Sequence, residues 1–119
     1  MTIIVAGHTG LVGSAIFDAL GGSNSGVIGI NSKVVDLLDR KVTFEFIQDH
    51  KPELVIDAAA IVGGIGANSE RRVEFLSKNL QIQGNLMDAA HAANVERFVF
   101  LGSSCIYPRQ APQPIKEEY

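Results

Sequence analysis

Three glycines near the start of the chain have the spacing of a phosphate-binding turn. Gly7, Gly10 and Gly13 form a G-x-x-G-x-x-G pattern directly after the apolar run Ile3–Ala6. The first glycine lets the chain turn sharply, the second lets backbone N–H groups approach a pyrophosphate, and the third lets a helix pack closely. The helix N-terminus then offers free N–H groups and a positive dipole end. The pattern predicts dinucleotide binding, with a plain strand-to-helix turn as the alternative.

The glycine turn and the segment after the next strand together indicate which dinucleotide is bound. The whole loop is expected to contact the dinucleotide, namely Gly7, His8, Thr9, Gly10, Leu11, Val12 and Gly13. NAD-binding domains usually carry an acidic residue about 20 residues after the glycine turn, and this residue binds the ribose 2′-OH. This chain has Asn31, Ser32 and Lys33 there, and polar groups with a cation suit a 2′-phosphate better. NADP(H) is therefore the expected cofactor, with a solvated turn as the alternative.

Two further segments are expected beside the same cofactor. Asp36 and Leu37 follow the strand next to the glycine turn, so they are expected at the adenine. Ala58, Ala59 and Ala60 end another apolar run, where open α/β sheets bind their ligands. Small side chains there would let a flat ring lie against the strand end. Ordinary tight packing explains the alanines equally well.

The elements that must position these residues follow from hydrophobic patterning. Apolar runs predict five strands, and they alternate with segments of helical periodicity. This alternation predicts an α/β fold: a doubly wound, mostly parallel sheet of Rossmann type in strand order 3-2-1-4-5. The whole chain, 1–119, is expected to be one dinucleotide-binding domain with an irregular Pro-rich tail at 109–119. The strands are expected at 3–6, 27–30, 34–37, 54–60 and 97–102.

Helices are expected after Gly13, over 40–50 and over 70–94, with a loop at 61–69. Asp39 is expected to cap the second helix, in which Val42, Phe46 and Ile47 would face the sheet. The third helix would carry Val73, Leu76, Leu80 and Met87 on one stripe and end at Asn94.

Composition limits the class of protein. The 119 residues carry a net charge of −3, which gives no basic patch for nucleic acid or a membrane surface. No apolar run is long enough to cross a bilayer, and no cluster with metal-ligand spacing is present. The single cysteine, Cys105, excludes an internal disulfide and fits a reducing cytoplasm. These properties argue against nucleic-acid and membrane partners and favour a cytoplasmic location.

Three stretches of the sequence carry a family resemblance, namely residues 7–13, 58–68 and 101–108. Together they resemble the GDP-L-fucose synthase family of extended short-chain dehydrogenases/reductases. The resemblance runs in the family's order from residue 3 to about residue 115. Its most specific parts are Val62-Gly63-Gly64-Ile65 and Gly102-Ser103-Ser104-Cys105-Ile106-Tyr107-Pro108, and the glycine turn is shared more widely. The resemblance implies an NADPH-dependent epimerase/reductase that acts on a GDP-linked 4-keto-6-deoxy-mannose.

The resemblance also implies roles for two catalytic residues. The substrate ketone acidifies the protons on C3 and C5, and NADPH delivers hydride to C4. Ser103 matches the serine that hydrogen-bonds the carbonyl oxygen, and Cys105 matches the cysteine that moves the carbon-bound protons. From spacing alone, Ser103 could simply cap a loop and Cys105 could be a buried small side chain.

The family's Tyr-x-x-x-Lys pair has no counterpart in these 119 residues. Tyr107 is followed four residues later by Ala111, and Tyr119 is the last residue. Thr9 also stands where the family often carries Arg. The chain is therefore expected to be a truncated, N-terminal part of such an enzyme. It would work as a homodimer or with a complementing C-terminal chain, or it would be a stand-alone NADP(H)-binding or interaction module.

Overall fold

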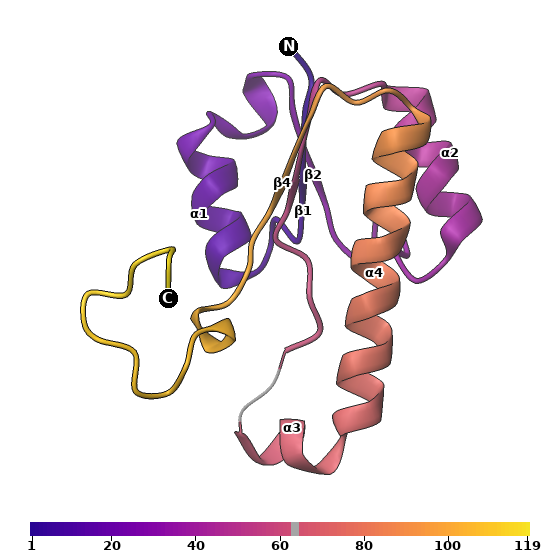
Figure 1. Ribbon diagram of the computed structural model, residues 1–119. Coiled ribbons are helices and arrows are strands. Elements are labelled where there is room, and N and C mark those ends of the chain that lie inside the picture. Colours follow the sequence, from indigo (N-terminus) through magenta and orange to yellow (C-terminus); the bar gives the residue numbers. More distant parts are fainter. Residues whose placement is uncertain (63–64) are drawn as a thin grey trace.

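Four parallel strands form a single sheet in the order β2-β1-β3-β4 (Figure 1). The computed structural model describes residues 1–62 and 65–119. Ala6 is paired with Ile30 on one side and with Asp57 on the other, and Asp57 is paired with Phe100. The carboxyl ends of all four strands therefore lie along the same edge. The strands are β1 Ile3–Ala6, β2 Val27–Ile30, β3 Leu54–Asp57 and β4 Arg97–Phe100.

Helices cover both faces of the sheet, which confirms the doubly wound α/β class. Figure 1 shows α1 (Leu11–Ala19) on one face and α2 (Arg40–His50) with α4 (Arg72–Ala92) on the other. The 21-residue α4 is much longer than the strands, and half of it projects past their carboxyl ends. There it meets the short helix α3 (Ile65–Glu70). Two 3₁₀ turns complete the structure, η1 Gly22–Asn24 and η2 Ser104–Ile106.

The core divides into two layers that follow the alternation of side chains along each strand. The layer beneath α2 and α4 is the larger, and its fully buried members include Ile4, Ile30, Ile47, Val55 and Leu86. The layer beneath α1 holds Val5, Val27 and Ile56, with Ile16, Phe17 and Leu20 packed against them. The apolar runs read as strands at 3–6 and 27–30 therefore supply both layers.

The strand expected at 34–37 does not form, so the sheet has four strands rather than five. The backbone N–H groups of Val34 and Val35 both donate to the Asn31 carbonyl. The Asp36 carboxylate accepts the N–H of Leu38. These bonds hold the segment in local turns, and it does not join the sheet ladder. Val35 and Leu37 still bury their side chains in the core, which explains the apolar pattern.

The helical segments differ from expectation in which residues they expose. Residues 65–70 form α3 where a loop was expected, while residues 63 and 64 of that loop lie outside the described residues. Asp39 caps α2 as expected, through a bond from the Val42 N–H to its carboxylate. Val42 itself is exposed, however, and Thr43 is buried in its place.

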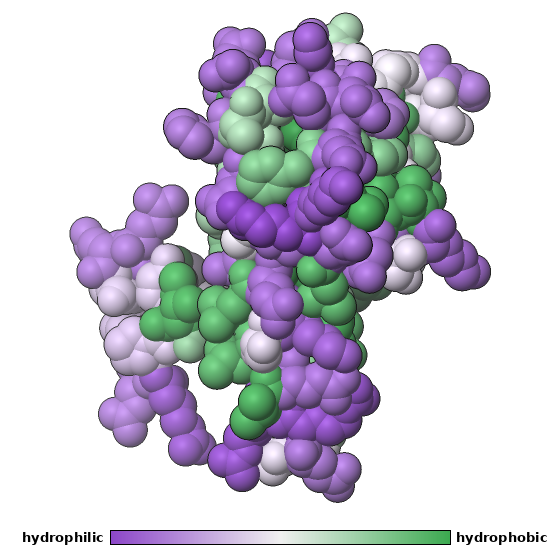
Figure 2. Space-filling view, turned by 90° about the vertical axis from the view of Figure 1, so that its right-hand side faces the viewer, coloured by the Kyte–Doolittle hydropathy of each residue, from purple (hydrophilic) through white to green (hydrophobic). Residues whose placement is uncertain are grey.

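The apolar stripe of α4 faces outward. Val73, Leu76, Leu80 and Met87 are exposed, and the buried face instead carries Phe75, Ile82, Asn85, Leu86, Ala89 and Ala90. Asn94 adopts a left-handed conformation (φ 55°) just past the helix end, as expected. Figure 2 views the side of the molecule that carries α2 and α4 and shows apolar surface exposed in its lower half.

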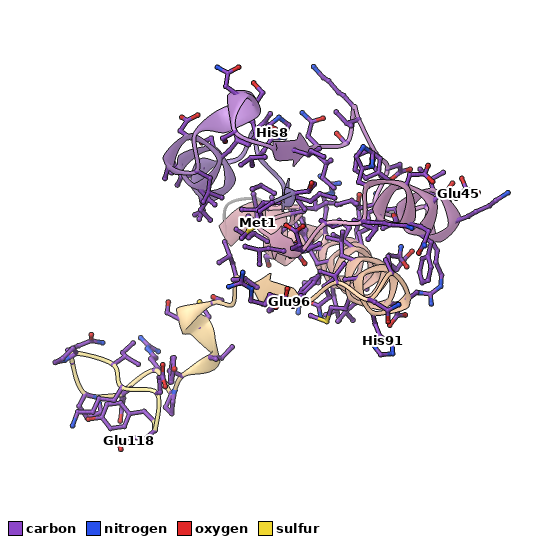
Figure 3. The ribbon with its side chains drawn as sticks, turned by 90° about the horizontal axis from the view of Figure 1, so that it is seen from above. Met1, His8, Glu45, His91, Glu96 and Glu118 are labelled. Carbon is purple, nitrogen blue, oxygen red and sulfur yellow. The ribbon has the colours of Figure 1, made fainter. Side chains whose placement is uncertain are left out.

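The strand β4 forms one edge of the sheet and is poorly covered. Val99 and Phe100 are 43% and 47% exposed, respectively. After η2, residues 107–119 form neither helix nor strand, and Figure 3 shows Glu118 well away from the sheet.

Candidate functional site

The glycine turn joins β1 to α1 in a geometry that excludes side chains at two of its positions. Gly7 has a φ of +79°, and a Cβ on it would lie 2.6 Å from the Ala58 carbonyl oxygen. A Cβ on Gly13 would overlap the carbonyl of Gly7. The turn is closed by a bond from the Gly10 N–H to the Gly7 carbonyl (3.0 Å). The backbone of Gly7 therefore lies so close to that of Ala58, and the backbone of Gly13 so close to that of Gly7, that only glycine fits at positions 7 and 13.

Gly10 is different, because it is the N-cap of α1 and has an ordinary extended conformation. Its φ is −78°, no side chain caps the helix, and a Cβ would meet only the Gly7 carbonyl oxygen, at 3.3 Å. The first turn of α1 contains neither an acidic residue nor a capping bond. This helix end therefore presents backbone donors to an anion.

A cavity of about 340 Å³ lies at the carboxyl edge of the sheet, against this turn. Three segments form its walls: the glycine turn, the irregular segment after β2 and the segment after β3. The residues that line it are Gly7, Thr9, Gly10, Asn31, Ser32, Val35, Asp36, Leu37, Leu38, Ala58, Ala59, Ala60, Ile61 and Ile82. Ten of the fifteen residues expected to bind a cofactor lie in this lining.

The other five expected cofactor residues lie outside the lining. Leu11 and Val12 project from the first turn of α1, where they are 92% and 52% exposed. Gly13 is buried against Gly7, and Lys33 is exposed next to Ser32. Leu11, Val12 and Gly13 could therefore meet a ligand only through backbone atoms or at the rim.

His8, the fifth, turns its side chain away from the cavity. Its ring lies between β2 and α1, against Gly29 and 5.2 Å from the ring of Phe17 (Figure 3). The ring nitrogen Nδ1 is buried and has no hydrogen-bond partner among the residues that the structure describes. The histidine of this turn therefore supports the packing of the loop rather than lining the cavity.

Two asparagines of α4 hold the cavity walls, and sequence reasoning did not identify either of them. Asn79 makes a two-bond pair with the backbone of Ile61: its Oδ1 accepts the N–H at 2.7 Å and its Nδ2 donates to the carbonyl at 3.0 Å. Asn85 is buried and donates from Nδ2 to the Leu37 carbonyl at 2.8 Å. The helix therefore connects both irregular walls to the core.

Asp57 is a third residue that the sequence did not single out. It ends β3, directly before the alanines of the cavity wall, and it is 2% exposed. Its Oδ1 accepts the N–H of Ala59 at 3.0 Å, while Oδ2 has no hydrogen-bond partner within residues 1–62 and 65–119. Burial raises the pKa of this carboxyl to about 6, and the Ala59 N–H bond acts in the opposite direction.

Ser103 is the N-cap of the turn η2, and Cys105 lies within it. Both follow β4 at the same edge of the sheet but outside the cavity lining. Both residues are exposed. The Ser103 hydroxyl oxygen accepts the N–H of Cys105 at 3.1 Å, so the serine caps the turn. The two candidate catalytic residues are thus adjacent and accessible.

The charges near the cavity are few. Among the lining residues that the structure describes, Asp36 is the one that carries a formal charge, and its carboxylate accepts the Leu38 N–H. In the same described part of the chain, no group of three His, Cys, Asp or Glu side chains is placed to hold a metal ion. No described helix is both long and apolar enough to cross a membrane.

A comparison with family models matches residues 3–119 to the NAD dependent epimerase/dehydratase family. Among relatives, the GDP-L-fucose synthase of Sinorhizobium fredii is 44% identical over 116 residues. GDP-L-fucose synthase 1 of Arabidopsis thaliana is 47% identical over 118 residues. These alignments cover 98% and 97% of this chain but only 37% and 36% of the relatives, so the chain spans little more than a third of their length.

Solved structures agree with this assignment. A GDP-mannoheptose C4 reductase from Campylobacter jejuni with NADP bound is 35% identical and superposes with a TM-score of 0.87. A GDP-D-glycero-L-gluco-heptose synthase from the same organism, solved in the presence of NADPH, gives the same values. Each match covers 99% of this chain, and the matched parts are 38% and 35% of those proteins.

Proposed function

Because this chain belongs to the NAD dependent epimerase/dehydratase family, we propose that its cavity binds NADP(H). We further propose that the chain forms the cofactor-binding part of an epimerase/reductase for a GDP-linked 4-keto-6-deoxy-mannose type of sugar. The observation that carries the proposal is the cavity, which combines a glycine turn, an uncapped helix end and a wall of alanines. The NADP-bound C4 reductase of similar fold supports the choice of cofactor.

The residues of the cavity suit the parts of a dinucleotide. The N–H groups at the start of α1 and the space over Gly10 would accept the pyrophosphate. Asn31 and Ser32 line the cavity with polar groups and Lys33 lies beside them, which suits a 2′-phosphate. Asp36 and Leu37 would contact the adenine, and the alanines 58–60 would contact the nicotinamide end.

Bound NADPH would supply hydride to the C4 carbonyl of the sugar. The Ser103 hydroxyl already accepts the Cys105 N–H, and this leaves its own proton available for donation to a substrate carbonyl oxygen. The exposed Cys105 thiol would remove or return protons at C3 and C5. Its thiolate fraction would determine how well it does so.

Calorimetric titration with NADP⁺, NADPH, NAD⁺ and NADH tests the cofactor proposal directly. We expect tighter binding of the phosphorylated pair, and equal or reversed affinities would contradict this specificity. Gly10→Ala should fold, because the new Cβ meets only one backbone oxygen at 3.3 Å, but it should weaken binding by occupying the pyrophosphate space. Gly66→Ala is the matched control, because a Cβ there meets nothing within 4 Å.

A second candidate function is a stand-alone NADP(H)-binding or interaction module without turnover. It is favoured by one observation: Ser103 and Cys105 lie outside the cavity lining. Cofactor binding is common to both candidates, so the measurement of turnover separates them.

We also propose that the chain associates, either with a second copy or with a polypeptide that carries a Tyr-x-x-x-Lys helix. The β4 edge leaves backbone groups open to pairing, and α4 exposes Val73, Leu76, Leu80 and Met87. The single free thiol, Cys105, supports a reducing compartment such as the cytoplasm.

A further inference from the structure

The cavity wall formed by residues 35–38 has no strand to hold it. Local turn bonds involve Val35 and Asp36, and the segment does not pair with β2 or any other strand of the sheet. Yet Val35 and Leu37 are 3% and 8% exposed, so the wall is well packed. A wall of irregular backbone needs a fixed contact if it is to keep one shape when a ligand binds against it.

Asn85 supplies that contact from the buried face of α4. Its Nδ2 donates to the Leu37 carbonyl at 2.8 Å across a separation of 48 residues. The asparagine is 7% exposed and is not part of the cavity lining. It therefore touches the wall from behind, on the side away from any ligand.

The orientation of the Asn85 amide is itself fixed. Its Oδ1 accepts a bond from Arg40 Nη1 at 3.4 Å, and the same nitrogen lies 2.8 Å from Asp88 Oδ2. The Arg40 guanidinium also lies 4.7 Å from the centre of the Phe44 ring. Because the cation occupies the Oδ1 side, the Nδ2 donor of Asn85 faces Leu37.

We infer that Asn85 is a positioning residue that sets the shape of the adenine end of the cofactor cavity through the Leu37 carbonyl. The inference rests on the proposed function, because it assumes that NADP(H) occupies this cavity. Asn79 holds the opposite wall at Ile61, so α4 fixes the two ends of the cavity through separate side chains. Loss of Asn85 should thus affect one end of the ligand and not the other.

The test uses Asn85→Asp, which keeps the size and the acceptor for Arg40 but replaces the donor with an oxygen facing the Leu37 carbonyl. Ligand binding of Asn85→Ala is compared with that of Asn85→Asp, because Asn85→Ala removes the donor without adding a charge. We expect roughly tenfold weaker binding of NADP⁺ and of adenosine 2′,5′-bisphosphate in both variants, because the Leu37 carbonyl loses its hydrogen-bond donor. Binding of nicotinamide mononucleotide should be unchanged.

Asp88→Asn is the matched control, because it lies on the same helix and alters the Arg40 ion pair but leaves the bond to Leu37. It should bind all three ligands as the wild type does. Equal loss for adenosine 2′,5′-bisphosphate and nicotinamide mononucleotide, or no loss for either, would overturn the inference.

Amide hydrogen exchange of the ligand-free protein separates this inference from the proposed function. Asn85→Asp should speed exchange over residues 34–39 while leaving β1 and β3 protected. If exchange over 34–39 is unchanged, the positioning role is wrong even if NADP⁺ binds. If the wild type binds no NADP(H), the proposed function is wrong, and with it the assignment of this wall to adenine.

Discussion

The imidazole ring of His8 fills the space that a side chain at position 29 would occupy. A Cβ built on Gly29 would overlap the ring carbons and lie 2.9 Å from Nδ1. The ring is enclosed on its other side by Phe17 of α1. The glycine turn and the strand beside it are thus fitted to one another through two residues that do not themselves line the cavity.

Replacing Gly29 by alanine should therefore disturb the glycine turn from outside. The new methyl group must displace the His8 ring, and overpacking of this kind costs about 1–3 kcal/mol of unfolding free energy. Urea unfolding measures the cost, and calorimetry should show weaker NADP(H) binding. In a His8→Ala background the same substitution should cost much less, because the ring is gone. Equal costs in both backgrounds would contradict this account.

The buried carboxyl of Asp57 should make stability depend on pH. Its pKa in the folded protein is raised from 3.8 to about 6 by burial, so the folded state holds the proton more tightly than the unfolded chain does. Stability should then fall as the pH rises from about 4 to about 6, by at most roughly 3 kcal/mol.

Asp57→Asn should remove this part of the pH dependence. The variant cannot ionise, and its side-chain oxygen can still accept the Ala59 N–H. Its stability relative to the wild type should rise between about pH 4 and pH 7, by roughly 1–3 kcal/mol in chemical unfolding. A constant difference across this range would mean that Asp57 titrates normally.

Gly84 lies within α4 and should tolerate a side chain. A Cβ there meets nothing within 4 Å, and its φ lies outside the left-handed range. Gly84→Ala should stabilise the protein by about 0.5–1 kcal/mol, because alanine loses less backbone freedom in a helix. Gly13→Ala is the opposite case, since its Cβ overlaps the Gly7 carbonyl, and it should be strongly destabilising. Thermal unfolding should show a higher Tm for Gly84→Ala and a lower Tm for Gly13→Ala than for the wild type.

The 119-residue chain alone should reduce a GDP-4-keto-6-deoxy sugar only very slowly. A positioned acid or base contributes about 10²–10⁴-fold to a rate, and the Tyr-x-x-x-Lys pair is not among these residues. Loss of NADPH absorbance and deuterium uptake from heavy water are the measurements. Activity that appears only with an added polypeptide carrying this pair, and disappears in Ser103→Ala, supports the epimerase/reductase proposal. Rapid NADPH oxidation by the chain alone contradicts the prediction and points to Tyr107 or Tyr119 as the acid.

Association should depend on the outer face of α4. We expect light scattering to show a species larger than the monomer at high concentration, or a complex when a complementing chain is present. Leu80→Glu places a charge in the middle of the exposed apolar stripe and should reduce association without unfolding, since Leu80 is 53% exposed. A wild type that is monomeric at high concentration and binds no hydrophobic dye would rule the association out.

Local patterns were sufficient to predict much of the fold. The runs at 3–6 and 27–30 and the capped helix 40–50 form as predicted, because period, caps and turn residues agree there. The segment 34–37 failed because its apolar residues were needed in the core while Asn31 and Asp36 offered the backbone local partners. Apolar residues that are buried in a turn therefore give the same sequence pattern as apolar residues in a strand.

The candidate site was predictable only where the chemistry lies in neighbouring residues. The glycine turn and the alanines 58–60 could be assigned to the cavity from their own types and spacing. Asn79 and Asn85 could not, since their role depends on partners 18 and 48 residues away. The burial of the Asp57 Oδ2 atom could not be predicted either, because it depends on the strands β1 and β4 on both sides of β3.

The position of β1 in the sheet has a consequence for how the chain is made. The first of the four strands to leave the ribosome is an inner strand of the sheet, and its two partners begin at Val27 and Leu54. Until both have emerged, Ile4 and Val5 have no complete sheet around them, so the nascent chain carries an unpaired apolar strand until Leu54–Asp57 has been made. The interval between the synthesis of β1 and that of β3 is thus the stage at which these strands are most exposed to aggregation and to chaperone capture.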